Sequence, residues 1–266
     1  MYLIRLAAFA VTVALSPLAM PESQLEPLHA HCVIGPSESE KPGAFRIRIY
    51  EGDDDDCYDG RNCSSHFNHD PFTRLTGITR SDLARDGAHL TATVAGEAGT
   101  FNCSGTVHDD VLRGDSVFTP DPAFVDRLEK MGFSGFTSEK LEAYAFFNVQ
   151  SDWVRSLQQA GVKGMSEDNL LAMRIFNVEP AYISSITALG YPMPDAEKLI
   201  AFRVHKVDPE EIRQIRALGY QPSFDDLIQI RIFHITPEFI HKMQDRGFKD
   251  LSLSKLVQIK IFKLDE

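Results

Sequence analysis

The second half of the chain repeats one pattern of polar and apolar positions. A glycine followed by a large apolar residue recurs at intervals of 29, 29, 29 and 28 residues, at Gly132, Gly161, Gly190, Gly219 and Gly247. A leucine stands nine residues after each glycine, or eight in the fourth copy, at Leu141, Leu170, Leu199, Leu227 and Leu256. A period in this range is typical of stacked repeats. The pattern predicts five copies of one unit.

Each copy predicts two helices. The first, helix A, begins ten residues before the glycine, with Ser151 in the second copy and proline in the others, at Pro122, Pro180, Pro209 and Pro237. Proline is preorganised for the first helical position, and glycine permits a left-handed cap after the last one. The second, helix B, begins four residues before the leucine, at Thr137, Ser166, Asp195, Ser223 and Ser252. Their side-chain oxygens can accept hydrogen bonds from the free amides of a starting helix.

Helix B has a wide apolar face, illustrated in the fourth copy by Leu227, Ile228, Ile230, Ile232 and Phe233. A single hairpin of about 29 residues cannot bury such a face alone, but stacked neighbours can. We therefore expect an elongated, slightly curved surface of the kind that suits binding.

Residues before the repeats have a different pattern. Polar and apolar side chains alternate in Phe45–Glu51, His89–Val94 and Thr100–Val107, which predicts strands. The segments between them are rich in Gly, Asp, Asn and Ser, so we expect a small antiparallel sheet or sandwich. The predicted fold class is α+β: a small N-terminal antiparallel β domain over residues 21–118, then an all-α solenoid of five helical hairpins over residues 119–266.

The first twenty residues have the layout of an export signal. Arg5 precedes a short apolar run, Leu6–Leu15, which Ser16 and Pro17 close. The run is short for a membrane span of about 20 residues. We expect residues 1–20 to be a signal peptide and the protein to be periplasmic or secreted. The alternative is a retained N-terminal anchor, with the protein facing the periplasm.

All four cysteines, Cys32, Cys57, Cys63 and Cys103, lie between the export signal and the repeats. An even number in an exported segment suggests two disulfides, for which three pairings exist. We favour Cys57 with Cys63, which closes a short polar loop, and Cys32 with Cys103, which ties the chain entry to a strand.

The charge argues against some partners. The chain has a formal net charge of −11, and by count residues 21–118 contribute −9 and residues 119–266 contribute −3. Phosphate binding needs clustered Lys and Arg, so we expect no nucleic acid partner.

The acidic loop is the sharpest candidate for metal chemistry. It contains Asp53–Asp56 and Asp59, followed by His66 and His69. Carboxylates and imidazoles can ligate metals, and Asp55, Asp59, His66 and His69 are the candidate ligands. However, a calcium loop starting at Asp55 would place Cys57 at its third position and His66 at its twelfth. A solvated acidic loop is therefore favoured over a metal site.

No common catalytic signature is found in the sequence. It contains no HExxH, no GxSxG elbow, no phosphate-binding glycine loop and no CxxC pair. We predict that the protein is not an enzyme and uses no cofactor.

Helix B also repeats a cation, at Arg174, Arg203, Arg231 and Lys260, with Ala145 at this position in the first copy. These cations could form a stripe that grips an acidic partner, or each could pair with a carboxylate of a neighbouring helix, such as Glu210 or Glu238. Structural pairing is favoured because repeated positions have repeated surroundings.

A helix A column of apolar residues is assigned to the core: Phe124, Trp153, Tyr182 and Phe239, with Ile212.

The repeat motif, clearest in Val207–Tyr220 and Ile235–Ile240, resembles a family of bacterial helical-repeat proteins of unknown function. Similar repeats follow the peptidase part of some membrane metallopeptidases related to beta-lactam sensors. Gly99–Gly105 and Phe118–Phe124 resemble the domain that precedes the repeats there. The resemblance covers roughly residues 88–266 and implies this architecture. It implies no catalytic residue, because the zinc-binding motif and membrane helices of those peptidases are missing here.

Together these observations predict an exported module that binds a protein or peptide. One alternative is a sensor or regulatory part that works with a membrane protein, as the resemblance implies. A metal-dependent hydrolase centred on His66, His69 and the acidic loop is the less favoured alternative.

Overall fold

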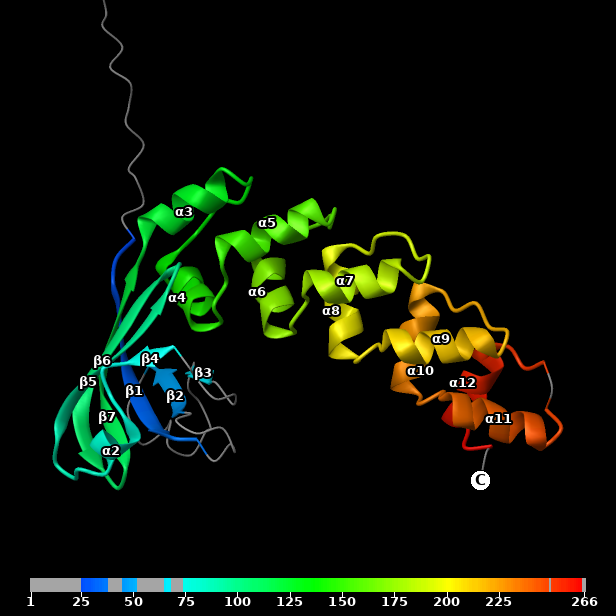
Figure 1. Cartoon of the computed structure of the whole chain (residues 1–266), viewed down its shortest axis with the longest axis horizontal. Coiled ribbons are helices and arrows are strands. Elements are labelled where there is room, and N and C mark those ends of the chain that lie inside the picture. The colour runs from blue at the N-terminus through cyan, green and yellow to red at the C-terminus, as the bar shows by residue number, and fades with distance from the viewer. Residues whose placement is uncertain (1–24, 38–44, 52–64, 68–73, 249, 265–266) are drawn as a thin grey trace, which may run out of the picture.

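The computed structural model describes residues 25–37, 45–51, 65–67, 74–248 and 250–264. Strands occupy the first part of this chain and a run of paired helices the rest, as predicted for an α+β protein (Figure 1). The helices form an elongated, curved array with the sheet at its N-terminal end.

The β domain is one antiparallel sheet with the strand order β3-β2-β1-β7-β6-β5-β4. Its strands are β1 (Leu28–Pro36), β2 (Phe45–Tyr50), β3 (Ser65–Phe67), β4 (Leu75–Thr76), β5 (His89–Gly96), β6 (Gly99–His108) and β7 (Val111–Pro120), with the short helix α2 (Arg80–Leu83) before β5. The three predicted strands correspond to β2, β5 and β6. Among the described residues the sheet is single rather than a sandwich.

The sheet is strongly curled, and one disulfide spans the curl. Cys32 on β1 and Cys103 on β6 are bonded although β7 lies between these strands, and their Cα atoms are only 6.0 Å apart. In a flat sheet, strands two places apart are separated by about 9–10 Å. The paired residues Gly105 and Gly114 permit close contact of β6 with β7, because a Cβ atom at either would lie 1.9–2.0 Å from a backbone oxygen. The Cys32–Cys103 pairing is thus confirmed, whereas the predicted Cys57–Cys63 pair lies outside the described residues.

The helices form five hairpins of one helix A and one helix B each. In chain order the hairpins are α3 (Pro122–Glu129) with α4 (Ser138–Phe146), α5 (Ser151–Gln159) with α6 (Glu167–Ile175), α7 (Pro180–Thr187) with α8 (Ala196–Val204), α9 (Pro209–Ala217) with α10 (Phe224–Ile232), and α11 (Pro237–Asp245) with α12 (Leu253–Ile261). Figure 1 shows α3, α5 and α7 along one side of the array, and α4, α6 and α8 along the side on which the sheet lies.

The residues that begin helix B and end helix A are those that the sequence predicts. Each predicted residue before helix B accepts a hydrogen bond from a first-turn amide through its side chain. The five repeat glycines have φ between 82° and 93°, the left-handed region that glycine enters without strain. Helix B ends in a second left-handed column that the sequence did not reveal, at Asn148, Asn177, Lys206, His234 and Lys263.

The hydrophobic core runs without a break from the sheet into the array. One cluster of buried side chains extends from Cys32 and Ile34 in the sheet through the first two hairpins to Ile183 and Leu199. A second cluster begins at Ile186 in the third hairpin and fills the fourth and fifth. The sheet therefore shares a core with the first hairpins rather than forming a separate globule.

We expect the double substitution Cys32→Ser and Cys103→Ser to lower the free energy of unfolding by about 2–4 kcal/mol, because the bond closes a long loop in the unfolded chain. The shared core predicts that the sheet and the first two hairpins lose amide protection together. Hydrogen exchange read by mass spectrometry would show this, with the fourth and fifth hairpins as the internal reference. Loss of protection confined to the sheet would contradict a shared core.

The left-handed position of His234 generates a second prediction. Its φ is 52°, a conformation that disfavours side chains with a Cβ, so His234→Gly should raise the free energy of unfolding by about 0.5–1 kcal/mol. His241→Gly is the matched control, since His241 is exposed within α11 and glycine there should destabilise by a similar amount. Thermal and urea unfolding would measure both, and a loss of stability in His234→Gly would refute the argument.

Candidate binding surface

The three helix B arginines of the cation column point between hairpins and cap the preceding helix B. The guanidinium Nε of Arg174 donates to the Phe147 carbonyl at 3.3 Å, that of Arg203 to the Phe176 carbonyl at 2.9 Å, and that of Arg231 to the His205 carbonyl at 3.3 Å. Each accepting carbonyl belongs to the residue that ends the previous helix B. A cation there satisfies a free carbonyl and the negative end of the helix dipole.

Each cation also contacts helix A of its own hairpin. Arg174, Arg203 and Lys260 lie over the rings of Trp153, Tyr182 and Phe239 at 5.6, 4.9 and 4.0 Å from the ring centres. Cations are attracted to the electron-rich faces of aromatic rings. The column predicted to lie in the core is buried at Phe124, Trp153 and Phe239 and half-buried at Tyr182. Three of its rings also contact a helix B cation.

The fourth hairpin replaces the ring with a carboxylate. Counting 29 residues from Tyr182 leads to Glu211, and Arg231 donates to Glu211 at 2.6 Å. Ile212, which we placed in this column, is one residue further along and is buried in the core. The predicted pairing with carboxylates is thus found at Glu211 and, for Arg174, at Glu179 (2.7 Å), whereas Glu210 pairs within its own helix with Arg213.

An arginine from the β domain supplies a further cation beside the first hairpin. Ala145 occupies the cation position of α4, and Arg74, which precedes β4, donates to the carbonyls of Ala145 at 3.0 Å and Phe146 at 2.7 Å. Burial, and secondarily the charge of Arg174, lower the pKa of Arg74 to about 10, so it remains protonated at neutral pH. This contact ties the sheet edge to the end of α4.

One residue after each cation, helix B exposes an apolar side chain. We name these four residues the ridge: Ile175, Val204, Ile232 and Ile261, with exposed fractions of 41%, 44%, 46% and 50%. A step of one residue turns about 100° around a helix, which explains why the cation faces the neighbouring hairpin and the ridge residue faces outward. Half-buried apolar residues four positions earlier, such as Leu171 and Ile200, extend the same face.

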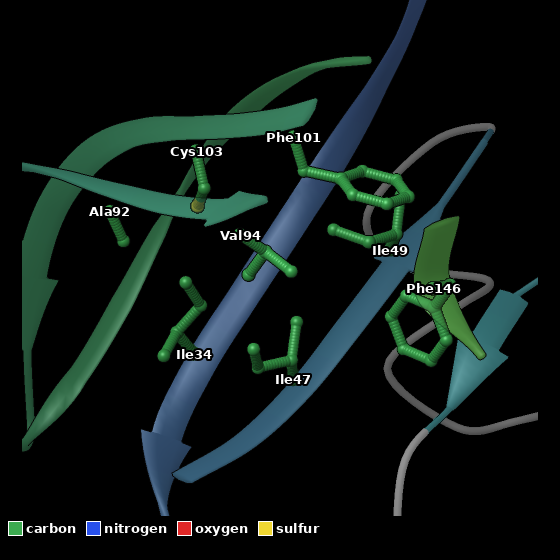
Figure 2. Close-up of a pocket in the computed structure, with 8 residues that line it drawn as sticks. All are labelled: Ile34, Ile47, Ile49, Ala92, Val94, Phe101, Cys103 and Phe146. Carbon is green, nitrogen blue, oxygen red and sulfur yellow. The ribbon is translucent and has the colours of Figure 1, made fainter. Parts of the chain in front are cut away.

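In the first hairpin, the sheet packs on the equivalent face of helix B. Phe146 is the ridge equivalent in α4, and only 3% of it is exposed because the inner face of the sheet covers it. Figure 2 shows its ring directed into the same space as Ile47, Ile49 and Phe101, and its centre is 6.0 Å from that of Phe101. The cavity left among the lining residues is about 10 Å³, too small for an organic ligand.

Carboxylates line the opposite end of the helices B. We name this set the acidic edge: Glu139, Glu167, Asp168, Glu197, Asp225 and Asp226, all in the first turns of α4, α6, α8 and α10. Lys140 pairs with Asp168 at 3.0 Å and Lys198 with Asp225 at 2.8 Å, each linking one hairpin to the next. A hydrogen bond from the Thr137 hydroxyl, and then one from its own backbone amide, lower the pKa of Glu139, so this carboxylate is ionised at neutral pH.

The structure does not describe the side chains of the candidate metal ligands. Asp55, Asp59 and His69 lie outside the described residues, and His66 is described only through its backbone, which pairs with Ile49 at the β2–β3 edge. Within the described part of the chain, no group of three or more His, Cys, Asp or Glu side chains is arranged to hold a metal ion.

Comparison with protein-family models, with curated proteins and with solved structures finds no match to this chain. None of the helices in the described ranges has the length and apolar character needed to span a membrane.

The cation column generates a prediction about stability. Arg203→Met removes a charge-assisted hydrogen bond and a cation–ring contact, so we expect it to lower the free energy of unfolding by about 1–3 kcal/mol. Arg203→Lys should retain part of this, since Lys260 performs the ring contact in the fifth hairpin.

Arg213→Met is the control, because Arg213 makes an exposed ion pair within α9 that contributes under about 1 kcal/mol. Urea unfolding monitored by circular dichroism measures all three variants. Equal effects of the Arg203→Met and Arg213→Met substitutions would show that the column does not link the hairpins.

Proposed function

We propose that the protein is an exported binding module whose helical array binds a protein or peptide along the ridge. The observation that carries this proposal is the contrast between Phe146, which the sheet covers, and the four equivalent residues of the ridge, which are 41–50% exposed. Apolar groups of the sheet thus bury this helix position in the first hairpin, whereas in the other four hairpins the described residues leave nearly half of the side chain exposed.

Exposed apolar side chains in a continuous set are typical of interaction sites on soluble proteins. Single exposed apolar residues are ordinary, but the ridge repeats at one position of four successive helices that pack side by side. Its residues carry no titratable group, and this favours binding over catalysis as the role of the surface.

The disulfide indicates an oxidising, extracytoplasmic compartment. Together with the apolar run at Leu6–Leu15, it supports a periplasmic or secreted location, or anchorage by the N-terminal segment with the array facing the periplasm. A partner in the membrane would make the protein a sensor or regulatory component, and a soluble partner would make it a free binding module.

Site-specific photo-crosslinking tests this proposal. A benzoylphenylalanine at position 204 or 232 should form a defined adduct in periplasmic or membrane extracts, whereas the same probe at Ser184 or Arg213 on helices A should not. The Ile175→Asp substitution should reduce the adduct, since a charge would enter the apolar surface. The extract in which the adduct forms identifies a soluble or membrane partner. Absence of any adduct, or the same adducts from all four positions, would contradict binding at the ridge.

A further inference from the structure

Resting on the function proposed above, we infer that the ridge receives an extended, cationic segment of a partner protein, with apolar side chains at every third residue. Three features of the helix B face lead to this chemistry: the repeat distance of the ridge, the carboxylates at one end of the helices, and an aromatic column beside the ridge.

The distance between successive ridge residues favours a polyproline-type conformation for the segment. α6, α8, α10 and α12 pack in series, and packed helices lie about 8–10 Å apart, so ridge residues recur at about this distance. An extended polyproline-type segment rises about 3.1 Å per residue with three residues per turn, so its side chains recur on one face every ~9.3 Å. A β-strand repeats on one face every ~6.6 Å, which does not match the ridge.

The acidic edge favours a positively charged segment. Its carboxylates lie about seven residues before the ridge residue of the same helix, which is about 10 Å along the helix axis. Lys and Arg side chains of a segment seated on the ridge can reach toward them. Asp168 and Asp225 have lysine partners. Glu167 accepts a hydrogen bond from the Ser134 amide at 2.7 Å, and Asp226 accepts from the Ser223 amide at 2.9 Å. Among the described residues, none of the other acidic-edge carboxylates forms an ion pair with Lys, Arg or His.

An aromatic column beside the ridge favours the same conformation. The residue after each ridge position is Phe176, His205, Phe233 or Phe262, and Phe176 is 40% exposed. Aromatic surfaces bind the preformed polyproline-type helix at low entropic cost. The ridge and this column together form an apolar track, with the acidic edge toward the first turns of the helices B.

The geometry disfavours a second copy of the chain as the occupant. The sheet lies on the same side of the array as the helices B (Figure 1), so two arrays placed face to face in parallel would bring their sheets together. Turning one array end for end avoids this contact but places acidic edge against acidic edge. A slender segment satisfies both constraints.

Three synthetic peptides test the inference, each built from five triplets: Leu-Lys-Pro, Leu-Glu-Pro and Ser-Lys-Pro. Measured by fluorescence anisotropy on the full chain, Leu-Lys-Pro should bind at least tenfold more tightly than either of the others. Its affinity should fall several-fold in the variant Glu197→Lys, whose side chain is exposed, and should fall with added salt. Val204→Ser with Ile232→Ser should remove binding while leaving the helical circular dichroism unchanged, because both side chains are half exposed.

Glu129→Lys is the matched control, since this exposed carboxylate lies on α3, away from the acidic edge, and it should leave the affinity unchanged. Equal binding of Ser-Lys-Pro would reduce the effect to general charge attraction and overturn the inference. So would equal binding of Leu-Glu-Pro, no binding of Leu-Lys-Pro, or a dimer in sedimentation that depends on Val204 and Ile232. In each case, a specific photo-adduct from position 204 would still support the proposed function. Absence of that adduct as well would contradict both the inference and the proposed function.

Discussion

The structure depends on one constraint: a hairpin of about 29 residues cannot bury its own apolar faces. Val149, Val178, Val207 and Ile235, which follow helix B in the first four hairpins, are all 0–3% exposed. Neighbouring elements must cover each of these side chains, so each hairpin is stabilised mainly by its contacts with the next. The curled sheet closes the first end of this series, and its disulfide and paired glycines hold the curl that allows it to do so.

Polar links between hairpins repeat along with the packing. One side chain, such as Arg203, caps the previous helix B and stacks on its own helix A, so it joins three helices at once. The fourth hairpin keeps the link with Glu211 in place of a ring, which shows that the cation needs an attractive partner rather than a particular residue type. Arg74 extends the link to the sheet and makes the β domain part of the array.

The sequence predicts the array well because its signals are local. Prolines, cap residues and glycines act within a few positions, and all five hairpins begin and end where these residues stand. The sequence also favours the Cys32–Cys103 pairing, which the structure contains. The strand order that places β7 between these cysteines, and the contact of Arg74 with Ala145, depend on long-range contacts that spacing does not encode. The apolar pattern of helix B predicts burial of Ile232 together with Leu227 and Ile230, but the structure leaves 46% of Ile232 exposed. The direction of this side chain depends on how the helices pack, which the pattern alone does not give.

Adjacent positions of helix B therefore have different explanations. The cation at 174, 203, 231 and 260 is accounted for by carbonyls, rings and carboxylates inside the chain. The ridge residue that follows it has an internal explanation only in the first hairpin, where Phe146 fills the hollow of the sheet. An apolar identity at four exposed positions loses favourable burial unless something covers it. The described residues bury this position only in the first hairpin, and the exposure of the other four is the basis on which we propose a partner.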